Sequence, residues 1–180
     1  RAPFWVIHPV FCNNVTIRGV SIISHGPNND GCNPESCKNV LIEECLFDTG
    51  DDCIAIKSGR NNDGRNTPIP SENIIVRNCR MKAGHGGVVM GSEISAGVRN
   101  VFVENCEMDS PRLRRVIRIK SNTVRGGFVE NLYVRNVNVG QCDEAIFRVE
   151  LKYEQRDGDG PFMPVIKNVE LRNVTSQRSR

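Results

Sequence analysis

The amino-acid sequence predicts an all-β protein folded as a right-handed parallel β-helix. A nine-residue pattern occurs six times, with Asn first, aliphatic residues second and fourth, Cys or Val seventh and, except in the last copy, an apolar residue ninth. Each copy alternates apolar and polar residues and is rich in Val and Ile, which is typical of a β-strand. Successive copies lie 25, 34, 27, 31 and 37 residues apart, a period typical of a solenoid of stacked coils. The copies begin at Asn14, Asn39, Asn73, Asn100, Asn131 and Asn168.

Two further features favour a β-helix over other solenoids. Leucine-rich repeats place Leu at fixed positions of a similar period, whereas Leu is rare here. There is little helical patterning between the copies, and parallel strands cannot be joined by hairpin turns. We therefore expect a single domain over residues 1–180 with about six coils. Because neither end of the sequence offers a capping segment, we also expect it to be an internal fragment of a longer domain that lacks its end caps.

The seventh position of the pattern is expected to lie inside the solenoid once per coil. The residues found there are Val20, Cys45, Cys79, Cys106, Val137 and Val174. Three of the eight cysteines are thus predicted to be small buried hydrophobes rather than reactive thiols or metal ligands. Of the others, only Cys32 and Cys37 are spaced for a local disulfide. The first-position Asn residues are expected to form a ladder of side-chain amides at one corner of the coil.

Charge and composition limit the partners. No apolar run approaches the roughly 18 residues that a membrane span needs. The net charge is only +3, from 24 basic and 21 acidic residues, but six cations and no acid lie between residues 112 and 125. Such a local field suits a polyanion, which on charge alone could be nucleic acid, phosphate or acidic polysaccharide. The six cations are Arg112, Arg114, Arg115, Arg118, Lys120 and Arg125.

Three aspartates are spaced by one coil. Asp51 and Asp52 follow Asp30 by 21 and 22 residues, so all three are expected at equivalent corners of adjacent coils, about 4.8 Å apart along the axis. Their carboxylates would then stand on the order of 6 to 9 Å apart, which leaves room for a water as in inverting glycosidases. His85 continues this column on the next coil, and Arg118 and Lys120 are expected on the coil after it. Taken singly, each Asp could be a turn residue, and the Asp51-Asp52 pair could bind Ca²⁺.

Four short motifs resemble glycoside hydrolase family 28, the polygalacturonases. That family has Asn-Thr-Asp, Gly-Asp-Asp, Gly-His-Gly and Arg-Ile-Lys in this order on consecutive coils of a right-handed parallel β-helix. Here the motifs stand at residues 28–30, 50–52, 84–86 and 118–120, and the resemblance covers nearly the whole chain. The one departure is Asn29, where the family usually has Thr; the neighbouring Asp30 is retained.

The resemblance implies a role for each motif residue. Asp51 would be the general acid that protonates the glycosidic oxygen, while Asp30 and Asp52 would hold and deprotonate the attacking water. His85 would support the protonation of the acid or bind the sugar. Substrate-binding residues would be Asn28, Arg118, Lys120 and Tyr153, with Arg118 and Lys120 pairing with a galacturonate carboxylate. No cofactor or metal is implied, and the partner would be an acidic polysaccharide rather than nucleic acid or a membrane.

The resemblance is stronger to exo-acting bacterial and plant members, which have similar residues at 57–65, 91–93 and 121–127. The insertion between Gly59 and Glu72 could wall off one end of the cleft, and Arg60, Arg65 or Arg125 could bind a terminal carboxylate.

Two alternatives remain open on the sequence: a Ca²⁺-dependent pectate-lyase-like β-elimination, and a β-helical polysaccharide-binding fragment without activity. Because pectin is met outside the cytoplasm, we expect a secreted or periplasmic monomer, with residues 1–180 inside a longer catalytic domain.

Overall fold

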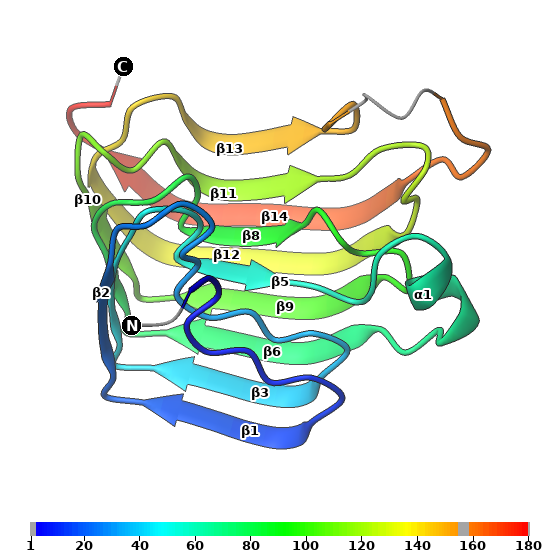
Figure 1. Ribbon diagram of the computed structural model, residues 1–180. Helices are drawn as coiled ribbons and strands as arrows, with labels where there is room; N and C mark the ends of the chain where they lie inside the picture. The colour runs from blue at the N-terminus through cyan, green and yellow to red at the C-terminus, as the bar shows by residue number, and fades with distance from the viewer. Residues whose placement is uncertain (1–2, 155–158, 180) are drawn as a thin grey trace.

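The computed structural model describes residues 3–154 and 159–179 and consists of two parallel sheets that wind into a β-helix (Figure 1). The larger sheet contains β1 (Asn13–Arg18), β2 (Ser21–Ser24), β3 (Lys38–Glu43), β4 (Leu46–Thr49), β6 (Ser71–Arg77), β7 (Arg80–Met81), β9 (Val98–Glu104), β10 (Glu107–Asp109), β12 (Phe128–Gln141) and β14 (Val165–Ser176). The smaller sheet contains β5 (Ile54–Ile56), β8 (Val88–Gly91), β11 (Arg115–Lys120) and β13 (Ala145–Glu150). The predicted fold class is confirmed.

The larger sheet forms two walls of the solenoid because β12 belongs to both. Its first half pairs in parallel with β9 and its second half with β10. The strand order β1-β3-β6-β9-β12-β10-β7-β4-β2 therefore runs up one wall and down the other, and the smaller sheet closes the third (Figure 1). A helix of five residues, α1 (Asn62–Asn66), lies in the insertion after β5. No helix among the described residues is long and apolar enough to cross a membrane.

The predicted asparagine ladder runs through all six copies of the repeat. Each Asn side-chain Nδ2 donates to the Oδ1 of the Asn one coil earlier, over 3.1, 3.0, 3.0, 2.8 and 2.9 Å in chain order. Each of these residues also has a left-handed backbone, with φ between 52° and 60°. Asn tolerates that conformation better than most residues because its short polar side chain hydrogen-bonds locally. The first position of the repeat is thus set by backbone geometry as well as by the ladder.

Asn73, in the middle of the ladder, allows the contribution of the amides to be measured. We expect Asn73→Ala to lower the free energy of unfolding by about 3 kcal/mol, because it removes two amide hydrogen bonds and places a Cβ without polar atoms at φ 57°. Asn73→Gly should lose about 1 kcal/mol less, since Gly adopts positive φ freely. Urea denaturation of both variants measures the difference, and equal losses would rule out a backbone contribution.

The inward position of the repeat packs as predicted. Cys45, Cys79 and Cys106 are buried in the core, and their thiols lie 3.2 to 3.3 Å from the backbone oxygens of the residues two positions earlier. Val20 and Val174, in the two end coils, are only partly buried against the same core. Cys32 and Cys37 are both buried and free, so the disulfide for which they are spaced is not formed.

Candidate active site

The three aspartates and His85 lie where the chain enters the smaller sheet. The backbone N–H of Gly31 donates to the carbonyl of Asp52 over 3.0 Å, and the N–H of His85 donates to the carbonyl of Asp51 over 3.1 Å. Each coil therefore adds its polar side chain beside that of the coil before. The expected column of Asp30, the Asp51-Asp52 pair and His85 is present in this register.

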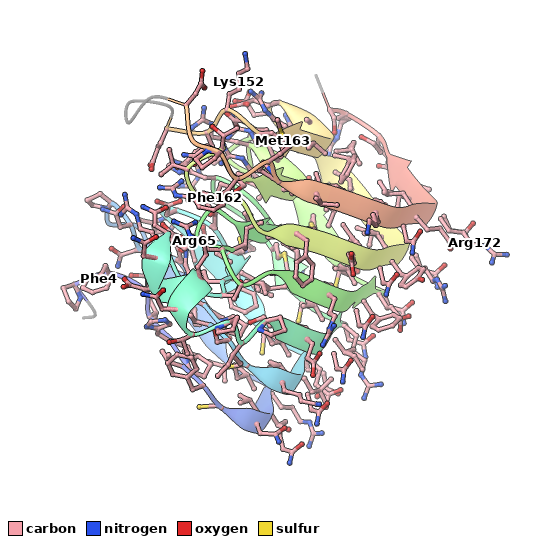
Figure 2. All side chains as sticks on the ribbon, turned by 90° about the vertical axis from the view of Figure 1, so that its right-hand side faces the viewer. Phe4, Arg65, Lys152, Phe162, Met163 and Arg172 are labelled. Atoms are coloured by element: carbon pink, nitrogen blue, oxygen red, sulfur yellow. The ribbon has the colours of Figure 1, made fainter. Side chains whose placement is uncertain are left out.

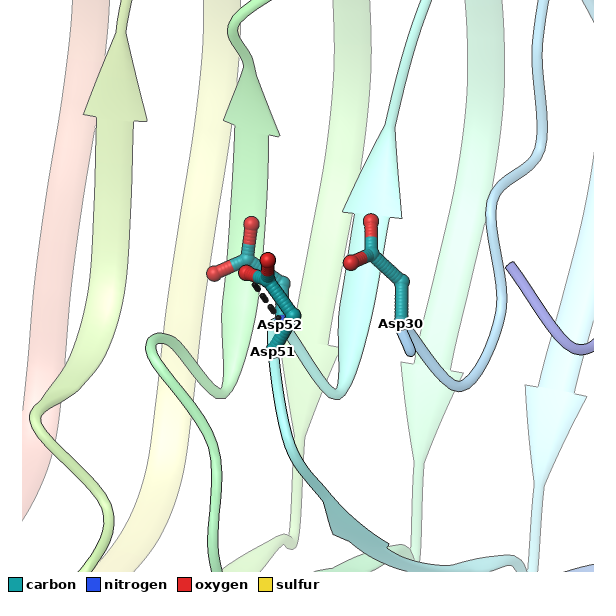
Figure 3. A group of neighbouring side chains, drawn as sticks. All are labelled: Asp30, Asp51 and Asp52. Carbon is teal, nitrogen blue, oxygen red and sulfur yellow. Dashed lines mark hydrogen bonds between the residues drawn. The ribbon is translucent and has the colours of Figure 1, made fainter. Parts of the chain in front are cut away.

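The three carboxyl groups lie side by side on the same face of the coil (Figure 3). One oxygen from each of Asp30, Asp51 and Asp52 lies within 4.8 Å of the others. This distance joins the nearest oxygens, whereas the expected 6 to 9 Å is a separation between whole carboxyl groups. Asp51 also accepts a hydrogen bond from the backbone N–H of Asp52 at 2.9 Å.

Each aspartate has its own basic partner. Lys120 Nζ lies 2.7 Å from Asp52 Oδ2, and His85 Nδ1 lies 3.0 Å from Asp51 Oδ1. Asp30 accepts a hydrogen bond from Asn33 Nδ2 at 2.5 Å, and Lys57 Nζ is 3.9 Å away. The negative charge of the three acids is thus balanced by side chains from other coils.

The environments of Asp30 and Asp51 separate their pKa values. Burial, assisted by the charge of Asp52, raises the pKa of Asp30 to about 7 although Lys57 lowers it. Burial also opposes the ionisation of Asp51, but the hydrogen bond and charge of His85 outweigh it, so the pKa of Asp51 is lowered. A group of close carboxyls shares its protons, and the two pKa values favour Asp30 over Asp51 as the group that holds a proton in the free protein.

The predicted substrate-binding cations surround Tyr153. The ring centroid of Tyr153 is 5.0 Å from Lys120 Nζ, 5.1 Å from Arg118 Cζ and 5.6 Å from Arg125 Cζ. Arg118 is held by Glu150 at 2.6 Å. Asn28 lies apart from this group: its side chain is exposed, and no hydrogen bond joins it to the three aspartates in the described part of the chain.

Lys57, Glu93 and Glu150 are functional candidates that the sequence analysis did not single out as site residues. Lys57 is buried and bonded to Glu93 at 2.8 Å, and Glu150 fixes Arg118. A buried Lys directly after a strand is a signal in itself, because Lys is almost never fully buried without a partner.

The three acids do not form a favourable metal site, although their oxygens are close enough to touch one cation. Calcium takes about six to eight oxygen ligands. Here Lys120 places positive charge beside Asp52, Lys57 adds charge near Asp30, and the ring of His85 occupies one side of Asp51. A divalent cation would have to displace or oppose these charges.

Comparison with known proteins identifies the family. Residues 1–180 match the model of glycosyl hydrolases family 28. The chain belongs to this family. It is 32% identical to a probable polygalacturonase of Vitis vinifera over 98% of this chain and 37% of the relative.

Solved family 28 structures share the fold. The crystal structure of a hyperthermoactive exopolygalacturonase from Thermotoga maritima superposes with a TM-score of 0.93 at 44% identity, over 98% of this chain and 39% of that one. A family 28 exopolygalacturonase from Yersinia enterocolitica gives a TM-score of 0.83 at 25% identity, over 98% of this chain and 31% of the other. This family 28 chain therefore spans about a third of the length of the relatives it matches.

Proposed function

We propose that this chain carries the catalytic centre of an enzyme that hydrolyses α-1,4-galacturonosyl linkages in polygalacturonate or pectin, with inversion and from the chain end. The observation that carries the proposal is the placement of acids and cations side by side. One oxygen from each of the three aspartates lies within 4.8 Å of the others, and Lys120 both contacts Asp52 and lies, like Arg118, over the ring of Tyr153. The acids suit glycoside hydrolysis, and the cations suit a uronate substrate.

Exposure favours Asp51 as the proton donor. Its side chain is 20% exposed, compared with 5% for Asp30 and 1% for Asp52, so it can reach a glycosidic oxygen bound over the sheet. Asp52 Oδ1 is buried and has no hydrogen-bond partner among the described residues. It is therefore available to accept a hydrogen bond from the attacking water. Asp30 and Asp52 act together as the base.

The protonation that the pKa values of the free protein favour is the one that the centre has after a turnover, not the one from which a turnover starts. In each turnover Asp51 gives its proton to the leaving oxygen, and the base takes a proton from the water that attacks the sugar. The centre then holds an ionised Asp51 and a protonated Asp30, which is the state that the pKa values of the free protein favour. A proton must pass from Asp30 back to Asp51 before the next turnover, across a separation of at most 4.8 Å.

Lys120 and Arg118 bind the carboxylate of the galacturonate at the cleavage site. One of the three Nζ donors of Lys120 is used by Asp52, which leaves others for a uronate. Arg118 is bonded to Glu150 through Nη2, and its buried Nε has no partner in the described part of the chain. Tyr153 packs against both cations and supplies an aromatic surface for the sugar.

The insertion that contains α1 supports action at the chain end. Arg65 in α1 donates to the carbonyls of Val124 and Arg125 at 3.1 and 3.2 Å, and its guanidinium lies 3.9 Å from the ring centroid of Phe162. Figure 2 shows Arg65 and Phe162 together on this side of the molecule. The insertion, which follows β5, is thereby fixed to the loops after β11 and β13, two and three coils further along the solenoid. We take it as a wall beside the smaller sheet. The two exopolygalacturonases that share the fold support the same mode.

The sizes of early products test the mode of action. We expect the full-length protein to release galacturonate monomer from polygalacturonate from the first minutes, with little loss of viscosity. Anion-exchange chromatography of a time course measures this. A broad ladder of oligomers at low conversion would show endo action and would overturn the proposed chain-end mode.

We also propose that the enzyme meets its substrate as a secreted or periplasmic monomer. The support is chemical: pectin is an extracellular polymer, and the cations of the site suit a polyuronate.

A further inference from the structure

Lys57 stands between two acids on neighbouring coils. Its Nζ is 2.8 Å from Glu93 Oε2 and 3.9 Å from Asp30 Oδ2, and the residue is 3% exposed. Water therefore screens these charges little, and each acid acts on Lys57 more strongly than it would at the surface. Glu93 is the nearer partner, so its negative charge offsets part of the effect that the positive charge of Lys57 would otherwise have on Asp30.

Trp5 covers Lys57 from the first coil. The ammonium lies 4.3 Å from the Trp5 ring centroid, and the backbone N–H of the next residue, Val6, donates to the carbonyl of Asp30 at 2.9 Å. The same short segment thus touches both the lysine and the aspartate. Because a cation over an aromatic face is attracted to it, Trp5 holds the ammonium in place without competing for its charge.

We propose that Lys57 is a positioning residue for Asp30 and that Glu93 sets how much of the Lys57 charge acts on Asp30. This inference rests on the proposed function, in which Asp30 takes up the proton of the attacking water. The pair lies outside the four family motifs and touches neither Lys120 nor Asp51 in the described contacts. Its effect is to tune the base through Asp30.

The electrostatics of the two acids support this arrangement. Lys57 lowers the pKa of Asp30 against the effects of burial and of Asp52. The pKa of Glu93 falls to about 2, because Lys57 and Arg125 outweigh its burial. The other charged or titratable groups around this cluster are Asp51 and Asp52 with their partners His85 and Lys120, the buried thiol of Cys53, and the His8–Glu35 pair beside Trp5.

Two substitutions should move the protonation of Asp30 in opposite directions. Lys57→Met removes a positive charge, so the protonated form of Asp30 persists to higher pH. Glu93→Gln leaves the charge of Lys57 unopposed, so Asp30 ionises at lower pH. A shift of about one pH unit is expected in each case, from the usual effect of a charge at this distance. Lys57→Arg keeps the charge and should restore most of the wild-type behaviour.

The test measures pH profiles of kcat/KM on polygalacturonate and the ¹³C carboxyl titration of Asp30 in the full chain. The proposed mechanism needs one proton on the three aspartates, so the alkaline limb reports its loss. We expect this limb to shift to higher pH in Lys57→Met and to lower pH in Glu93→Gln. The ¹³C titration assigns the shift to the carboxyl of Asp30 itself.

A matched pair on the opposite wall provides the control. Lys38 and Glu72 are bonded at 2.9 Å, far from the aspartates in the fold, so Lys38→Met and Glu72→Gln should leave both readouts unchanged. If Lys57→Met does not fold, Glu93→Gln alone still decides, because only a downward shift agrees with the inference. If the wild type is active and the two variants leave the titration of Asp30 unchanged, or shift it in the same direction, the inference is overturned. A wild type without turnover would instead contradict the proposed function, and the ¹³C titration would still test the inference.

Discussion

Asp51→Asn is expected to lower kcat on polygalacturonate by about 10³-fold, since general acid catalysis contributes on the order of 10² to 10⁴. An amide cannot give a proton to the glycosidic oxygen, although it has the shape of the carboxyl and can still contact His85. Substrate binding should change little, because the proposed carboxylate contacts come from Arg118 and Lys120. Steady-state kinetics measure the loss, and calorimetry of oligogalacturonate binding measures what remains.

Asp48→Asn is a suitable control for this experiment. Asp48 lies in β4 on the same coil, pairs with His25 at 3.3 Å and has a side chain 17% exposed, close to that of Asp51. The substitution is identical, but Asp48 is not one of the three converging acids. We expect nearly unchanged kcat. Near-normal kcat in Asp51→Asn would show that another carboxyl donates the proton, and Asp30 would be the first to examine because the pKa values favour it over Asp51 as the group that holds a proton in the free protein.

Lys120→Met should be comparably severe, for two reasons. It removes a cation that binds the uronate, and it leaves Asp52 with its side chain 1% exposed and without its ion-pair partner at 2.7 Å. Breaking a buried ion pair by removing one partner typically destabilises a protein by about 3 to 5 kcal/mol. Burial lowers the pKa of Lys120, but the opposite effect of Asp52 is larger, so the pKa is raised overall. The lysine therefore stays charged at neutral pH. We expect kcat/KM to fall by at least about 10²-fold.

Lys152→Met separates these effects from a general loss of positive charge. Lys152, the residue before Tyr153 in the chain, is exposed and projects from the surface of the molecule (Figure 2). Its loss should leave stability and kcat/KM within about twofold of wild type, as for most surface substitutions. Urea denaturation and initial rates on polygalacturonate should be measured for both variants. Lys120→Met with normal kcat/KM and normal stability would contradict both roles given to Lys120.

The fold could be predicted because one repeated pattern encodes it. Asn at the first position marks the corner where the backbone is left-handed, and the alternating apolar residues mark the face that points into the core. A second row of left-handed residues went unnoticed, since its occupants vary in type: Gly19, Glu44, Asn78, Asn105, Asn136 and Asn173. Only its last three members form a ladder, with hydrogen bonds of 3.2 and 3.1 Å. Backbone conformation, rather than residue identity, unites that row.

For the site, the sequence predicts only which residues lie at equivalent positions of adjacent coils, because the repeat determines that alone. The spacing of Asp30, Asp51 and Asp52 by one coil predicts that they lie together, but the directions of their side chains are not encoded in spacing. The contact of Lys120 with Asp52 joins residues 68 positions apart. The location of the shared proton depends on burial and on three basic partners from different coils. None of these follows from a local pattern.

One measurement tests the central claim most directly. The full-length protein is incubated with polygalacturonate in excess chelator, and the anomeric protons of the earliest products are followed by NMR. We expect undiminished activity and saturated galacturonate that appears first as the β-anomer, because the proposed mechanism is a metal-independent hydrolysis with inversion. The α-anomer first would show retention. Unsaturated products lost on chelation, or binding by the folded protein without any product, would contradict hydrolysis by the three aspartates.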